Sequence, residues 1–134
     1  MSIHQQIANS MGAHSSWKEK LQKAIASGAS DVSVTAMRQD NQCDFGKWLY
    51  GRELSEEEKR SAHYEQCQRL HRQFHLEVSK VLTLALASKK AEAARAMEPG
   101  SDFAICSTNL TKAMTDWDKE AIRMPSSSGS SGHR

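Results

Sequence analysis

Hydrophobic positions recur every three, four or seven residues along most of the chain, the spacing that places them on one face of an α-helix. The first such series runs from Ser2 to about Ala26, and Gly28 follows it as a helix stop signal. The pattern predicts a long amphipathic helix whose buried seam consists of Ile3, Ile7, Met11, His14, Leu21 and Ile25.

A second long helix is predicted from Ser55 to about Ala87. Ser55 followed three residues later by Glu58 has the form of a capping box, with further acidic residues in the first turn. The face expected to be buried contains Cys67, Leu70, Phe74, Val78, Val81, Leu82 and Ala85, and His71 and His75 lie on the same side.

The rest of the chain is read as two more helices and a connection. Residues 88–98 are Ala- and Lys-rich and form either a short helix or a continuation of the preceding one, ended by Pro-Gly, and residues 101–124 form the last helix. Residues 29–42 are a loop with a short helix around 32–38, and Cys43–Tyr50 gives one or two helical turns. These elements predict an all-α protein, an antiparallel four-helix bundle with a short additional helix carrying Cys43.

The length of 134 residues suits one domain with one core, which we place at residues 1–124. The tail, residues 125–134, is rich in Ser and Gly and resembles an added expression linker, so we expect it to be flexible.

The charge balance excludes several classes of partner. The chain carries 18 basic and 16 acidic residues, a net charge of +2, without a dense Lys/Arg run, so we expect no nucleic-acid or membrane binding.

The longest apolar stretch, around 81–87, is too short to span a bilayer. Three widely spaced cysteines are an odd number, which favours reduced thiols and a cytoplasmic location over a disulfide framework.

His71 and His75 are the first candidate metal ligands. Residues four apart on a helix lie on one face, about 6 Å apart along the axis, so the two imidazoles can grip one ion. His63 and Cys67 extend the same four-residue step, but His63 lies about 18 Å from His75 along the helix and cannot share its ion. Cys67 is read as a core thiol.

Two more candidates lie on other predicted elements. His14 falls in the seam of the first helix with Trp17 on the same side, and such a residue is either a hydrogen-bonded core histidine or a ligand. Cys43 begins the short helix, where free N–H groups and the helix dipole favour a thiolate, or it is a small buried residue at a corner. Together the four N and S donors, His14, Cys43, His71 and His75, suit a closed tetrahedral Zn²⁺ site.

Three motifs give the chain a family resemblance. His14-Ser-Ser-Trp17, Cys43-Asp-Phe-Gly46-Lys-Trp48 and His71-Arg-Gln-Phe-His75 follow in this order, with 25 residues between the first two and 22 between the last two. The chain thereby resembles the bacterial chemoreceptor zinc-binding domain over roughly residues 3–123.

The resemblance implies a helical bundle with His14, Cys43, His71 and His75 as Zn²⁺ ligands, supported by Trp17, Phe45, Gly46 and Trp48. It further implies a regulatory, non-enzymatic module of bacterial chemotaxis or cyclic-di-GMP signalling that often forms homodimers. Such a module would sense zinc, or oxidants such as hypochlorous acid, through Cys43 as the redox-active cysteine.

Rival hypotheses make different demands on the sequence. A di-iron or hemerythrin-like bundle requires His and Glu ligands from all four helices, commonly in Glu-x-x-His pairs, which are absent. A hydrolytic zinc enzyme requires an open coordination position, and H-E-x-x-H is also absent. A metal-free interaction bundle would use the same histidines and cysteines as core filler.

Overall fold

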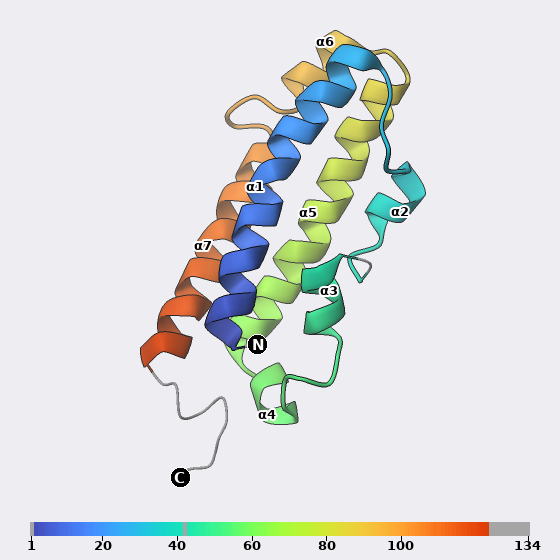
Figure 1. The fold of residues 1–134 in the computed structure, drawn as a ribbon. Helices are drawn as coiled ribbons and strands as arrows, with labels where there is room; N and C mark the ends of the chain where they lie inside the picture. Colours follow the sequence, from blue (N-terminus) through green and yellow to red (C-terminus); the bar gives the residue numbers. More distant parts are fainter. Residues whose placement is uncertain (1, 42, 124–134) are drawn as a thin grey trace.

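The computed structural model describes residues 2–41 and 43–123, and over this range it contains helices and no strand (Figure 1). Three long helices lie side by side: α1 (Ile3–Ser27), α5 (Ala62–Leu86) and α7 (Asp102–Arg123). The short helices are α2 (Val34–Arg38), α3 (Asp44–Leu49), α4 (Glu56–Lys59) and α6 (Lys90–Arg95). The predicted all-α bundle is confirmed, while the tail at 125–134 and residue 124 lie outside the described residues.

The chain passes up, down, up and down through the bundle (Figure 1). Helices α1 and α5 run in the same direction, and α7 returns antiparallel to both. The second, descending passage is not one continuous helix, because it consists of the short helices α2 and α3 with the non-helical residues 39–41 between them. Helix α2 packs on α5 and α3 packs on α1, so this broken passage is the part of the bundle that carries Cys43.

Serine side chains begin most of the helices. The hydroxyls of Ser2, Ser33 and Ser61 accept hydrogen bonds from backbone N–H groups in the first turns of α1, α2 and α5. Gly28 ends α1 in a left-handed conformation with φ of 74°, and its N–H donates to the Ala24 carbonyl at 2.7 Å. The predicted stop at Gly28 is therefore confirmed.

The predicted helix from Ser55 to Ala87 is wrong in one respect, since it is two helices. The capping box of Ser55 and Glu58 is present, but it starts only the single turn of α4. Ser61 then acts as a second N-cap and α5 begins at Ala62. A serine hydroxyl that binds the backbone two or three residues ahead competes with a continuing helix, and Ser61 starts a new one.

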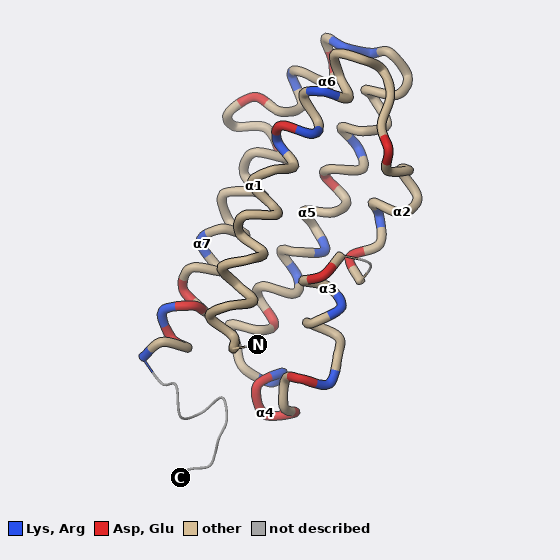
Figure 2. Tube along the Cα trace, in the orientation of Figure 1, with Lys and Arg blue, Asp and Glu red and all other residues tan. Residues whose placement is uncertain are grey.

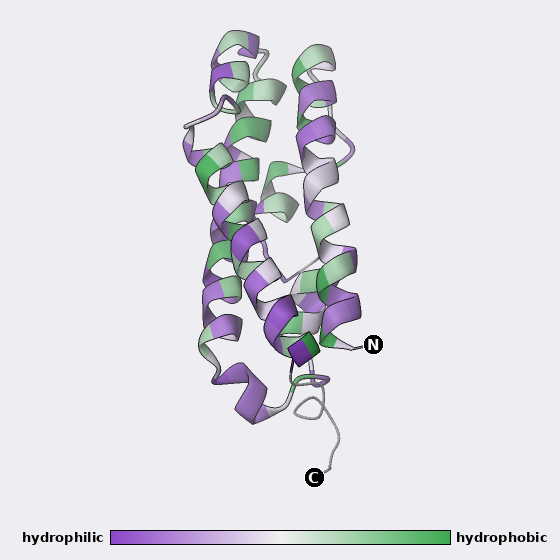
Figure 3. Cartoon of the chain, turned by 90° about the vertical axis from the view of Figure 1, so that its left-hand side faces the viewer, coloured by the Kyte–Doolittle hydropathy of each residue, from purple (hydrophilic) through white to green (hydrophobic). Residues whose placement is uncertain are grey.

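The core lies where α5 packs against α1 and α7, and hydrophilic residues occupy much of the outer faces (Figure 3). Cys67 is buried in it, as predicted for a core thiol. Cys106 is buried there too, and both thiols are free. Trp48 of α3 stacks at a tilt on Trp117 of α7, with ring centroids 5.5 Å apart, so the short helix is anchored to the core.

Charged residues of both signs alternate along the long helices, and acidic residues gather on α4 (Figure 2). Within the described residues, no helix combines the length and apolar character needed to cross a membrane.

Candidate metal centre

His71 and His75 point into the bundle from consecutive turns of α5. Their side chains are buried, at 0% and 4% exposure, and their Nε2 atoms lie 3.1 Å apart. The pair thus presents two imidazole nitrogens to one point, as the four-residue spacing predicts.

The ring of His75 is oriented by α2. Its Nδ1 lies 3.1 Å from the carbonyl oxygen of Met37. Because a carbonyl can only accept, the proton of the neutral ring is on Nδ1, and the lone pair of Nε2 is left facing His71. Metal-binding histidines in proteins are commonly fixed in this way by a backbone carbonyl or a carboxylate.

Cys43 meets this pair from the start of α3. Its Sγ lies 3.3 Å from Nε2 of His71 and 3.5 Å from Nε2 of His75. Cys43 is the N-cap of α3, and the backbone N–H of Gly46 donates to Sγ at 3.3 Å. The sulfur is half-buried and reaches the histidines without any change in the fold.

Gly46 allows the chain before Cys43 to pass close to α3. A Cβ on residue 46 would lie 1.8 Å from the carbonyl oxygen of Asp40 and 2.9 Å from Cα of Asn41. A side chain is therefore excluded at this position.

His14 reaches the same centre from the middle of α1. Its ring centroid lies 5.1 Å from that of His71, and one ring nitrogen from each of His14, His71 and His75 can be chosen so that all three lie within 4.8 Å. Within the described residues, Nδ1 of His14 and Nδ1 of His71 are buried without a hydrogen-bond partner. Buried polar atoms without a partner are uncommon in protein interiors.

Three of the donor atoms fit one face of a tetrahedral Zn²⁺ site. Zinc–nitrogen distances of about 2.0–2.1 Å and zinc–sulfur distances of about 2.3 Å give tetrahedral edges of about 3.3–3.6 Å. The observed triangle of Sγ and two Nε2 atoms has sides of 3.1, 3.3 and 3.5 Å. Three nitrogens and one thiolate sulfur are also the donor types that zinc binds well.

Burial keeps the imidazoles uncharged and available. Burial and the neighbouring rings lower the pKa of His14 to about 4 and that of His71 to about 2, and burial also lowers the pKa of His75. For Cys43 the sequence predicts a thiolate favoured by the helix N-terminus. The N–H of Gly46 does act in this direction, but burial outweighs it and raises the pKa of the thiol.

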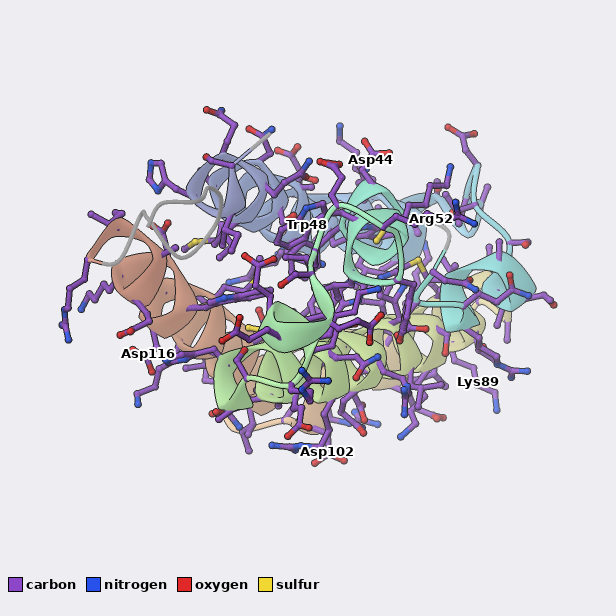
Figure 4. The ribbon with its side chains drawn as sticks, turned by 90° about the horizontal axis from the view of Figure 1, so that it is seen from below. Asp44, Trp48, Arg52, Lys89, Asp102 and Asp116 are labelled. Atoms are coloured by element: carbon purple, nitrogen blue, oxygen red, sulfur yellow. The ribbon has the colours of Figure 1, made fainter. Side chains whose placement is uncertain are left out.

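Aromatic side chains enclose the centre. Phe45 of α3 contacts His71 edge to face at 5.0 Å between centroids, and Phe74 of α5 contacts His14 at 4.9 Å. Trp48 packs against Phe45 at 5.6 Å and points inward from α3 (Figure 4). Of the predicted supporting residues, Phe45 and Gly46 therefore touch the candidate ligands, and Trp48 acts through Phe45.

A groove of about 710 Å³ between α1 and α3 leads to the centre. Trp17 and Trp48 line it together with His14, Cys43 and His75. Trp17 is half-buried, and the Lys20 ammonium lies 4.9 Å from its ring centroid. Trp17 thus borders the approach to the site.

The comparison with known proteins bears on this arrangement. The family described as chemoreceptor zinc-binding domain matches residues 14–82. The chain belongs to this family. The matched segment begins at His14 and contains all four candidate ligands of the family-type site. Curated proteins and solved structures gave no match.

The structure also contains contacts that sequence patterns did not reveal. The carbonyl of Met37 carries no signal in the sequence, because every residue has one. Asp40, which contacts Tyr50 and Arg72 beside the centre, was not singled out either. An acidic residue three positions before Cys43 is a weak signal in the sequence, and its contacts become visible only in the fold.

Proposed function

We propose that this chain is a zinc-binding regulatory domain in which His14, Cys43, His71 and His75 hold one Zn²⁺. The observation that carries the proposal is the meeting of Cys43 Sγ with the Nε2 atoms of His71 and His75, at 3.3 and 3.5 Å, in a member of the chemoreceptor zinc-binding family. Four protein donors leave no position for a substrate water, which supports a sensory rather than an enzymatic role.

The four donors come from three elements, and this supports a role in signalling. His71 and His75 share the rigid α5, His14 lies on α1, and Cys43 lies on the broken passage formed by α2 and α3. A bound ion would therefore tie the weakest passage to the two helices beside it. Loss of the Cys43 ligand would release α3, with Phe45 and Trp48 changing their burial.

Two stimuli act through this same ligand, namely a fall in zinc supply and oxidation of sulfur. Bound zinc would hold Cys43 as the thiolate, which is the form that oxidants attack. With hypochlorous acid, the sulfur of Cys43 takes up the oxygen as sulfenic acid and chloride leaves, so that RS⁻ and HOCl give RSOH and Cl⁻. The groove beside Trp17 provides the approach to this sulfur.

Family membership supports a setting for this role. We propose that the domain works in the bacterial cytoplasm as a homodimer and passes its signal to chemotaxis or cyclic-di-GMP signalling. Sedimentation analysis of the zinc-loaded protein tests the dimer, and a signal restricted to monomer would contradict it.

Metal analysis of the purified chain tests the zinc site. We expect close to one zinc per chain in the wild type, and a loss of at least tenfold in affinity in Cys43→Ala and in His71→Ala, because each removes one of four donors. His63→Ala is the matched control, since His63 is half-buried on α5 but outside the cluster. Iron in place of zinc, or equal zinc binding in Cys43→Ala and His63→Ala, would refute the proposal.

A further inference from the structure

We infer that Asp40, Tyr50 and Arg72 form a clasp that positions Cys43 against the histidine pair and limits how fast the sulfur leaves it. The inference rests on the proposed function, because it concerns the sulfur ligand of that site. The three residues bind no metal themselves, so their role is positioning.

The clasp is a set of contacts around one carboxylate. The hydroxyl of Tyr50 donates to Oδ2 of Asp40 at 2.6 Å, and Nε of Arg72 lies 3.9 Å from the same oxygen. Asp40 precedes Cys43 by three residues, Tyr50 is the C-cap of α3, and Arg72 follows His71 on α5. The contacts therefore join residues on the two sides of Cys43 to each other and to the helix that carries both histidines.

The backbone of Asp40 is also packed tightly against α3. The carbonyl of Asp40 lies against Gly46, where even a Cβ would be only 1.8 Å away. With Tyr50 bound to its side chain and Gly46 against its backbone, Asp40 contacts the middle of α3 and its C-terminal end. The approach of Sγ to the histidines thus depends on where Asp40 is held.

A second contact that holds α3, made by Tyr64, is shielded from water. The hydroxyl of Tyr64, on α5, donates to the carbonyl of Leu49 at 2.7 Å and is buried. In contrast, Tyr50 is 40% exposed and the side chain of Arg72 is 59% exposed. Because water competes for exposed hydrogen bonds, the clasp opens first, and Asp40 then moves away from Tyr50 while Tyr64 and Trp117 still hold the C-terminal part of α3.

The strength of the clasp sets the size of its effect. Loss of an exposed hydrogen bond to a charged group should shift the equilibrium between the closed and the open clasp by about tenfold, or about 1.4 kcal/mol. We therefore expect Tyr50→Phe and Asp40→Ala each to speed the departure of Cys43 about five- to tenfold. The double variant should be little faster than Asp40→Ala alone, since Asp40→Ala already removes the contact that Tyr50→Phe removes.

Asp118→Ala is the matched control. The Asp118 side chain is 21% exposed, against 15% for Asp40, and its Oδ1 lies 2.5 Å from Nδ1 of His4, joining α7 to α1 away from Cys43. This change removes a comparable contact between two elements. It should alter global stability without altering the motion of α3.

Three measurements on the full chain separate positioning from general stability. The first is the rate of zinc transfer to excess 4-(2-pyridylazo)resorcinol, and the second is alkylation of the metal-free chain by iodoacetamide, resolved for each cysteine by peptide mass spectrometry. Buried Cys67 and Cys106 serve as internal reporters of unfolding. The third is the thiolate-to-metal absorption of Co²⁺-loaded protein, which follows the geometry of the sulfur bond.

The inference predicts faster zinc transfer, faster alkylation of Cys43 alone and a weaker thiolate–Co²⁺ band in Tyr50→Phe, with Asp118→Ala like the wild type. The inference would be overturned if Cys43 in Tyr50→Phe were alkylated at a rate within twofold of the wild type. It would also be overturned if alkylation of Cys67 became faster in parallel with that of Cys43. If the wild type binds no zinc, the proposed function fails by itself, and the alkylation rates still decide whether the clasp exists.

Discussion

Two opposing effects act on the thiol of Cys43. As the N-cap of α3, its sulfur accepts a hydrogen bond from Gly46, which lowers its pKa, but burial raises the pKa by more. The side chain is therefore a neutral thiol at neutral pH in the metal-free chain. A metal ion must displace its proton, so the site couples metal binding to pH through this one residue.

This coupling predicts the pH dependence of zinc affinity. Between pH 7 and 8 the histidines are already neutral, because burial lowers the pKa of His75 below 6.5, that of His14 to about 4 and that of His71 to about 2, while the raised pKa of Cys43 keeps its proton in place. One proton is released for each ion bound, so affinity should rise about tenfold per pH unit. Competition titrations against a chelator of known affinity measure this slope.

A slope near zero would show that Cys43 is either already a thiolate or no ligand. A slope of two or more would show that charged imidazoles compete with the metal, contrary to the burial of His71 and His75.

Two glycines provide a second test at the level of single residues. Gly46→Ala places a methyl group 1.8 Å from the Asp40 carbonyl and should destabilise the fold by about 1–3 kcal/mol while displacing the chain before Cys43. Gly12→Ala is the control, because nothing lies within 4 Å of its Cβ position in the middle of α1. It should stabilise the protein by about 0.5–1 kcal/mol.

Urea unfolding of both variants, combined with zinc titration, measures these effects. Equal stability and equal zinc affinity in Gly46→Ala and Gly12→Ala would contradict the packing described around Asp40.

At the scale of elements, the broken second passage is the part of the bundle on which the site depends. Helix α2 contributes the Met37 carbonyl to His75, and α3 contributes Cys43, yet each helix has only five or six residues. Helices this short are not stable by themselves in water, so tertiary contacts must hold them. Zinc bound to Cys43 would add one such contact at the point where the passage is irregular.

Removal of zinc should therefore loosen this passage selectively. We expect amide hydrogen exchange across residues 37–50 to rise at least tenfold after chelation, with little change in the middle of α7, which contributes no ligand. The variant in which both His71 and His75 are replaced by alanine is the control, and its exchange should not respond to zinc. A uniform rise along the whole chain would indicate global destabilisation instead.

The sequence predicts the long elements better than the short ones. The seam of α1 follows from apolar periodicity over several turns, which fixes both the helix and its inward face, and Gly28 marks its end. The break at Ser61 was missed because helical periodicity continues across it, and a serine serves equally on a helix surface or at an N-cap. Such a choice depends on tertiary packing.

For the site, spacing alone predicted the pair His71 and His75, while His14 and Cys43 stayed open as core residues until the family resemblance added them. The fold brings both of them to the pair. Their partners could not be predicted. The Met37 carbonyl and the Asp40–Tyr50 contact depend on how the irregular backbone between α2 and α3 is placed, and no repeating pattern encodes that path.

At the scale of the whole molecule, the ligands join parts of the bundle that lie far apart in sequence. His14 and His75 are 61 positions apart, yet their ring centroids lie 6.5 Å apart. Structural zinc sites supply on the order of 10 kcal/mol of apparent binding free energy at neutral pH, comparable to the whole stability of a small domain. Occupancy of one site can therefore decide how firmly α1, α3 and α5 are held together.

Zinc K-edge X-ray absorption of the loaded protein tests this account most directly, because it counts the donors and identifies their elements. We predict one sulfur at about 2.3 Å and three nitrogens at about 2.0 Å, with the sulfur lost in Cys43→Ala and retained in Cys67→Ala. A shell of nitrogen and oxygen without sulfur, or a sulfur that persists in Cys43→Ala, would contradict the proposed centre.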